Sequence, residues 1–243
     1  PRLPAGYHRL PRDAAELDTW AEADRFKLDL VIPHVSRGAL LEIGPGIGMF
    51  ARLAQQHGFA VSAIEIDSAC VNFMDRALGI RAMESDDPAA VLREDGMRYD
   101  AICLWHAIEH LRRPWDVLAA AAAQLNPGGV LVVAAPNPQS RQARLLRSWW
   151  PHWDVPRHLF ALPVPWLKAR ACEYGLRLEC VTTRDAGGLY WNRFTWAMLG
   201  RRLLAWRDLG WRLGMRFGRL IEPWDGAEGK GAAYVAIFRR PSG

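Results

Sequence analysis

The sequence has few lysines, few cysteines and no long apolar run, and each shortage narrows the class of protein. Only three of the 31 basic residues are lysine, so arginine is used throughout and no single arginine indicates a function by itself. The four cysteines lie far apart without a CxxC pair, which excludes a disulfide framework and a zinc ribbon and predicts reduced core thiols. They are Cys70, Cys103, Cys172 and Cys180.

Two further absences concern membranes and secretion. No run of eighteen apolar residues is present, so we expect no membrane-spanning helix. The opening PRLPAGYHRL lacks the apolar stretch of a secretory signal. We therefore expect a cytoplasmic protein, either free or attached peripherally at the inner membrane.

The net charge of +5 comes from one segment. Between Leu189 and Trp224, seven arginines are opposed only by Asp208 and Glu222, so this segment carries the whole excess and the rest of the chain sums to zero. The basic charge therefore describes this segment and not the protein as a whole.

Strands alternating with helices predict one α/β domain over residues 1–243. Residues 13–33 have the apolar spacing of an N-terminal helix. Over 38–184, short apolar strands alternate with helices of about ten residues, which predicts a doubly wound, mostly parallel sheet with right-handed crossovers. Residues 187–228, rich in Trp and Arg, are too long for a simple loop and are expected to form a helical insertion. A last strand is expected at 232–240.

Three glycines at alternate positions follow the first strand of the core, in LLEIGPGIGMF. The first strand-to-helix turn of a doubly wound sheet approaches the ligand most closely. Gly44, Gly46 and Gly48 remove Cβ atoms there, so main-chain N–H groups and the helix N-terminus can contact an anionic group. A tight turn without a ligand is the alternative. The next strand ends in Glu65, where a carboxylate can accept both hydroxyls of an adenosine ribose.

LLEIGPGIGMFARLA, AVSAIEID and RYDAICLWHAIEHLRRPWDVLAAAAAQLNPGGVLVVAAPNP together resemble the class I S-adenosylmethionine-dependent methyltransferases. The sequence is similar to the branch that holds ubiquinone-biosynthesis O-methyltransferases and enzymes of bacterial cell-surface glycan clusters. The resemblance covers roughly residues 38–183. It implies a Rossmann-like seven-stranded sheet with an antiparallel last strand, and S-adenosyl-L-methionine as the cofactor.

The resemblance also implies roles for particular residues. Glu42 and the three glycines would surround the methionine part of the cofactor, and Glu65 would hold the ribose. Trp105 and His106 would lie beside the sulfonium. The adenine amine would meet an acidic or polar residue of MESDD. Glu84, Ser85, Asp86 and Asp87 are all open for this contact, with Asp86 as our candidate. No NPPY-like segment follows the fourth strand, which argues against N-methylation of adenine or glutamine.

Two rival chemistries share parts of the pattern. Residues 106–110 read H-x-x-E-H, the inverted zinc-protease signature, but they directly follow a strand and no further ligand is evident nearby, so we expect no metal site. A nicotinamide oxidoreductase of the short-chain type needs Tyr-x-x-x-Lys, which is missing. A protein that binds the cofactor without turnover, as a membrane-associated scaffold, is the non-enzymatic alternative.

The expected reaction is methyl transfer to an acceptor oxygen on a small molecule, a glycan or a lipid-linked intermediate. The candidate catalytic groups are His106, His110 and His158. The segment WDVPRHLF, which contains His158, has a second interpretation, in which Asp154, Arg157 and His158 pin the connection onto the sheet.

The segment 190–224 allows several functions. Its arginines and tryptophans fit an amphipathic helix on an anionic membrane, a cap over the site or a homodimer surface. Gly210, Gly214 and Gly218 recur every four residues and could let two helices pack closely. Nucleic acid is the least favoured partner.

Overall fold

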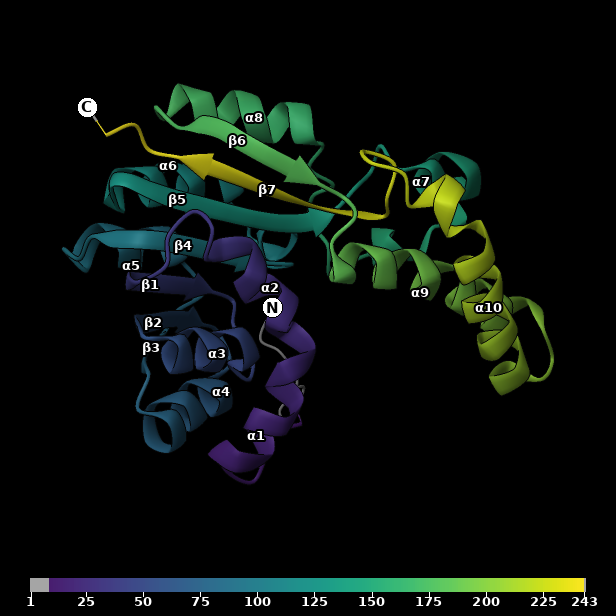
Figure 1. Cartoon of the computed structure of the whole chain (residues 1–243), viewed down its shortest axis with the longest axis horizontal. Helices are drawn as coiled ribbons and strands as arrows, with labels where there is room; N and C mark the ends of the chain where they lie inside the picture. The colour runs from purple at the N-terminus through teal and green to yellow at the C-terminus, as the bar shows by residue number, and fades with distance from the viewer. Residues whose placement is uncertain (1–8, 243) are drawn as a thin grey trace.

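A computed structural model describes residues 9–242 and contains a seven-stranded sheet in the order β3-β2-β1-β4-β5-β7-β6 (Figure 1). Most of the opening decapeptide lies outside the described residues. The strands are β1 (Gly38–Ile43), β2 (Phe59–Glu65), β3 (Arg81–Glu84), β4 (Tyr99–Trp105), β5 (Leu125–Pro136), β6 (Arg177–Thr182) and β7 (Ala233–Arg239). Strands β1 to β5 pair in parallel, whereas β7 runs antiparallel to both β5 and β6. The predicted fold class, including the antiparallel last strand, is confirmed.

Helices cover both faces of the sheet because each buries an apolar stripe against it. Apolar side chains of α2 (Arg25–Val31) and α3 (Met49–His57) pack on one face. Those of α5 (Pro88–Glu94), α6 (Pro114–Gln124) and α8 (Val164–Glu173) pack on the other. At the β2–β3 edge, α1 (Ala14–Ala21), α4 (Ser68–Phe73) and a π turn (Met74–Leu78) complete the core.

The N-terminal helix predicted over 13–33 is interrupted. A 3₁₀ turn at Glu22–Asp24 separates α1 from α2. Leu17 of α1 packs at the β2–β3 edge, while Leu28 and Val31 of α2 pack over the centre of the sheet. A straight helix cannot serve both surfaces, so the tighter turn redirects the chain. The cysteine prediction also needs a correction, because Cys172 is exposed and does not belong to the core.

The predicted insertion is a pair of antiparallel helices, α9 (Ala186–Leu203) and α10 (Arg207–Asp225). Figure 1 shows them projecting beyond the end of the sheet at which β5 and β6 terminate. A Cβ at Gly214 would clash with the Trp196 carbonyl oxygen, and one at Gly218 would lie 2.9 Å from the Arg193 Cα. The glycine spacing therefore serves close helix packing, as the sequence allowed. One continuous amphipathic helix over 190–224 is wrong, because the chain reverses between α9 and α10.

Candidate active site

The glycine turn connects β1 to α3 at the carboxyl end of the parallel strands. Gly44, Gly46 and Gly48 all adopt positive φ, at 74°, 56° and 84°, a region that side chains disfavour. A Cβ at Gly44 would lie 2.8 Å from the Ala107 Cβ, and one at Gly48 would lie 3.0 Å from Met74. Conformation and packing both require glycine at Gly44 and Gly48, and the turn is held against β4 and the π turn.

Glu42 lies directly before this turn, near the end of β1, and is 2% exposed. Its Oε2 atom has no hydrogen-bond partner among residues 9–242. Burial raises the pKa of this carboxyl to about 8, against the opposing charge of Lys27. A buried carboxylate without a partner is costly, so this position fits a ligand that carries positive charge.

Glu65 ends β2 and is fixed by backbone donors. Its Oε2 atom accepts a hydrogen bond from the Gly46 N–H at 2.8 Å. Its Oε1 atom accepts from the N–H groups of Ile66 and Asp67 at 2.7 and 2.9 Å. Since each carboxylate oxygen has two lone pairs, Oε2 keeps one for a further donor. The turn and this carboxylate thus form one unit, at the edge where the sequence analysis placed both.

Asp86 and Trp105 differ in their surroundings. Asp86 follows β3, next to the end of β2, and its exposed carboxylate lies 3.8 Å from an Arg112 nitrogen. Its neighbour Asp87 caps α5 by accepting from the Ala90 N–H, which leaves Asp86 the freer carboxylate for a ligand. Trp105 is 6% exposed and packs edge-on against Phe50, so its ring belongs to the core between the sheet and α3, and a contact with the sulfonium stays a prediction.

His106 follows β4 in a strained backbone conformation with φ of 54°. Its Nε2 atom accepts a hydrogen bond from the Trp191 indole N–H of α9 at 3.1 Å. Because an indole N–H only donates, the neutral imidazole carries its proton on Nδ1, which lies 3.5 Å from Glu109 Oε1. In this arrangement the acceptor nitrogen of His106 is already engaged. The contribution of Trp191 was missed at the sequence level, since no motif connects the insertion to β4.

His110 and His158, far apart in the sequence, are brought together. Their ring centroids are 4.8 Å apart. His110 lies in a 3₁₀ turn (Ile108–His110), and His158 belongs to the connection between β5 and α8. Leu159 N–H donates to the Glu109 carbonyl at 2.8 Å, which ties this connection to the turn. Arg157 and Asp154 form an ion pair within the connection itself. The connection is therefore tied to the turn by backbone groups, and the pinning role expected for the Asp154, Arg157 and His158 side chains stays a prediction.

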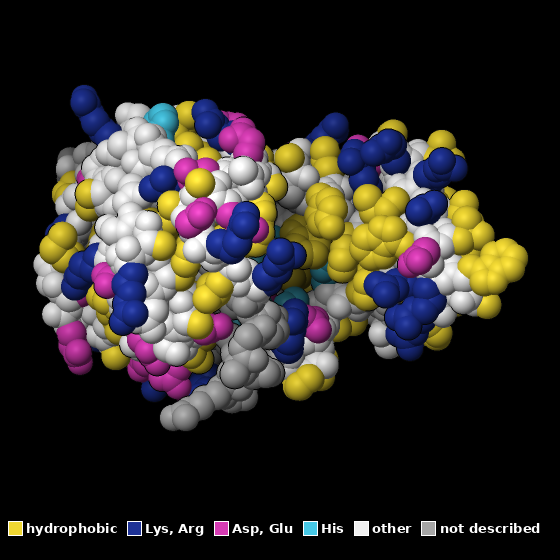
Figure 2. Space-filling model, turned by 90° about the horizontal axis from the view of Figure 1, so that it is seen from below, with side chains coloured by type: hydrophobic (Ala, Val, Ile, Leu, Met, Phe, Trp, Pro, Cys, Tyr) yellow, Lys and Arg dark blue, Asp and Glu magenta, His cyan; other side chains and the backbone are white. Residues whose placement is uncertain are grey.

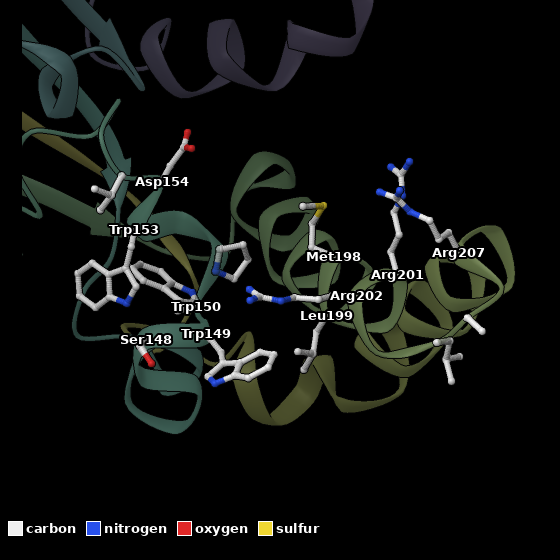
Figure 3. Close-up of a pocket in the computed structure, with 14 residues that line it drawn as sticks. Ser148, Trp149, Trp150, Trp153, Asp154, Met198, Leu199, Arg201, Arg202 and Arg207 are labelled. Atoms are coloured by element: carbon white, nitrogen blue, oxygen red, sulfur yellow. The ribbon is translucent and has the colours of Figure 1, made fainter.

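A groove of about 860 Å³ lies between the segment after α7 (Arg141–Leu146) and the helix pair (Figure 3), and its described lining residues include neither the glycine turn nor the candidate histidines. Its lining combines tryptophan rings with the arginines 201, 202 and 207, and Arg202 stacks over Trp149 at 4.4 Å. Trp150 in its lining contacts the ring of His152, which contacts Trp191. This aromatic series continues to His106 through Trp191, so the rings of His152 and Trp191 stand between the groove and the end of β4.

Comparisons with known proteins agree with this geometry. A sequence profile of the family described as "Methyltransferase domain" matches residues 16–181. A ubiquinone biosynthesis O-methyltransferase from Caulobacter vibrioides is 31% identical over 105 residues, which is 40% of this chain and 40% of that protein. The chain therefore matches well under half the length of this curated relative.

Two solved structures share the fold. A SAM-dependent methyltransferase from Archaeoglobus fulgidus superposes with a TM-score of 0.62 at 18% identity, covering 90% of this chain and 94% of the other. The cyclopropane synthase from Mycobacterium tuberculosis gives a TM-score of 0.57 at 17% identity, covering 88% and 82%. The resemblance found in the sequence is confirmed, and the chain belongs to the methyltransferase-domain family.

Proposed function

We propose that this enzyme transfers a methyl group from S-adenosylmethionine to an oxygen of its acceptor. The observation that carries the proposal is the buried Glu42 carboxyl beside the glycine turn, since one Glu42 oxygen lacks a partner among the described residues and the cofactor is a cation. The neighbouring Glu65 carboxylate, with a lone pair left on Oε2, supports a ribose contact.

The cofactor supplies a methyl group activated by a positively charged sulfur. In the transfer, the acceptor hydroxyl gives up its proton and its oxygen attacks the methyl carbon. The carbon–sulfur bond breaks and its electron pair stays on sulfur, which leaves S-adenosylhomocysteine and a methyl ether. The chain contributes by holding the reactants in line and by excluding water. His110 and His158 remain the candidate groups near the acceptor oxygen.

The groove favours an acceptor with both apolar and anionic parts. Its tryptophans can cover an apolar surface, and its three arginines match a carboxylate or phosphate. Among our candidate acceptors, a lipid-linked intermediate combines these properties best. A glycan or a small molecule combines the apolar and anionic parts less fully.

The helix pair supports attachment to an anionic membrane. Leu203 and Leu220 on the two helices are 63% and 77% exposed, and Trp206 in the turn between them is 75% exposed. The helices carry seven arginines. Figure 2 shows hydrophobic side chains on the projecting lobe with Lys and Arg around them. Within residues 9–242, none of the helices is long and apolar enough to cross a membrane. Flotation with phosphatidylglycerol vesicles should carry the wild type upward and leave a triple alanine variant of Arg212, Arg216 and Arg219 below; equal flotation removes this part of the proposal.

Calorimetry with S-adenosylmethionine, S-adenosylhomocysteine and NAD tests the reaction class. We expect both sulfur compounds to bind and NAD to bind weakly or not at all. Glu65→Ala should weaken binding by about 1 to 3 kcal/mol, because it removes charge-assisted hydrogen bonds. The matched control is Glu94→Ala, at the end of α5. Preference for NAD, or unchanged affinity in Glu65→Ala, contradicts the proposal.

A further inference from the structure

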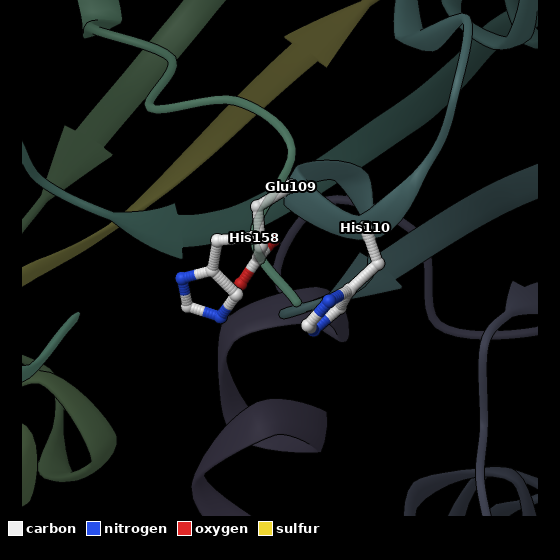
Figure 4. A group of neighbouring side chains, drawn as sticks. All are labelled: Glu109, His110 and His158. Atoms are coloured by element: carbon white, nitrogen blue, oxygen red, sulfur yellow. The ribbon is translucent and has the colours of Figure 1, made fainter. Parts of the chain in front are cut away.

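Glu109, His110 and His158 converge on one point (Figure 4). One potential ligand atom from each residue can be chosen so that all three atoms lie within 4.8 Å of one another. Glu109 is buried, His158 is half-buried and His110 is exposed, so the group is closed on one side and open on the other.

Hydrogen bonds fix both imidazoles in the same tautomer. His110 Nδ1 lies 3.0 Å from the Arg157 carbonyl oxygen, and His158 Nδ1 lies 2.8 Å from the His152 carbonyl oxygen. Since a carbonyl only accepts, each Nδ1 carries the proton and each Nε2 keeps a lone pair. Backbone carbonyls hold metal-binding histidines in this way.

Glu109, the third residue, is a buried acid without a hydrogen-bond partner within residues 9–242. Glu109 is 1% exposed, and neither carboxylate oxygen has a hydrogen-bond partner in the described part of the chain. The nearest charged or titratable contact is His106 Nδ1, at 3.5 Å. An isolated buried carboxylate is strongly unfavourable, and a bound cation removes that cost.

We propose that Glu109, His110 and His158 bind a divalent transition-metal ion, with Zn²⁺ as the best fit. Two imidazoles and one carboxylate are the ligand set of zinc sites that keep an open coordination position. Mg²⁺ and Ca²⁺ prefer oxygen ligands and fit less well. The third ligand, His158, comes from the connection between β5 and α8 and lies outside the H-x-x-E-H segment.

The role of the site rests on the proposed function. The cluster lies next to His106 at the end of β4, and its exposed side can admit an acceptor oxygen. A cation there would bind that oxygen in the open position and favour loss of its proton to solvent. His110 and His158 would then be ligands rather than bases. The acceptor would present a hydroxyl that can bind a metal, such as a phenol or a sugar diol.

The test measures zinc and cofactor binding separately, on the full chain. Protein freed of metal with a chelator is titrated with Zn²⁺ in a calorimeter. We expect one ion per chain, and roughly tenfold or greater loss of affinity in each of His110→Gln, His158→Gln and Glu109→Gln. His57→Gln, at the exposed end of α3, is the matched control and should bind like the wild type.

A spectroscopic measurement on the wild type avoids dependence on the folding of variants. Co²⁺ added to the metal-free protein should produce visible absorption bands of a nitrogen- and oxygen-ligated site, which Zn²⁺ then removes. An unchanged spectrum, no zinc uptake, or full affinity in correctly folded His110→Gln and His158→Gln variants overturns the proposal. Titration of S-adenosylmethionine into the same samples tests the methyltransferase proposal separately. Zinc binding is measured without turnover, so either proposal can fail without the other.

Discussion

Cofactor binding should release a proton from Glu42, and the size of this effect follows from its burial. In the free protein the pKa of Glu42 is about 8, so the carboxyl is mostly protonated at pH 6 to 7. A cation bound beside it favours the carboxylate. Ionising a group two pH units below its pKa costs about 2.7 kcal/mol. Affinity for S-adenosylmethionine should therefore rise up to about tenfold per pH unit from pH 6 and level off near pH 8.

Glu42→Gln isolates this contribution. The variant should bind the cofactor more weakly than the wild type above pH 8. Below pH 8 its affinity should not show the wild type's increase with pH. Titration of the cofactor's own amino group affects the affinity of both proteins equally. The measured quantity is therefore the difference in affinity between wild type and Glu42→Gln at each pH. Calorimetry in two buffers of different ionisation enthalpy gives the number of protons released.

The same substitution weakens cofactor binding but should stabilise the free protein. Because the folded-state pKa is above the unfolded value of 4.5, folded protein takes up a proton between these values and loses stability as pH rises. Removing the carboxyl should therefore increase the free energy of unfolding of the free protein at neutral pH by up to about 3 kcal/mol. The melting temperature should rise accordingly. Equal proton release in wild type and Glu42→Gln, with unchanged affinity, refutes the reasoning.

Three further predictions concern other parts of the structure. Trp191→Phe removes the donor to His106 Nε2, so the free energy of unfolding measured in denaturant melts should fall by about 1 kcal/mol, while cofactor affinity measured by calorimetry stays unchanged. The pKa of Glu179 is lowered to about 2, mainly by its hydrogen bonds with Arg239, so its contribution of about 2 kcal/mol is present above pH 4.5 and lost as pH falls toward 2. Acid unfolding of Glu179→Gln should lack this loss. Gly214→Ala should lower stability by about 1 to 3 kcal/mol in denaturant melts, because its Cβ would clash with the facing helix, whereas Leu213→Ala on the exposed side should change little.

The features predictable from the sequence are those encoded locally. Alternating apolar strands and amphipathic helices specify the doubly wound sheet, and Gly44 to Gly48 mark its first turn through their conformational freedom. The close packing of α9 on α10 was also visible in the spacing of Gly210, Gly214 and Gly218.

The features that escaped prediction depend on distant segments meeting in space. His110 and His158 were expected in one catalytic set, but their direct contact depends on the backbone hydrogen bonds that tie the His158 segment to Glu109. Trp191 was not expected at all, and it reaches His106 because the helix pair begins at the end of the sheet. Neither contact produces a periodic pattern or a fixed spacing in the sequence from which it could be predicted. The break between α1 and α2 likewise follows from the two surfaces that the helices must cover.

A crystal structure of the protein with S-adenosylhomocysteine tests the central claim most directly. The account predicts that the ribose hydroxyls contact Glu65 and that the amino-acid part of the ligand lies against the Gly44–Gly48 turn beside Glu42. A ligand bound elsewhere, or density absent from this turn at saturating concentration, would contradict it.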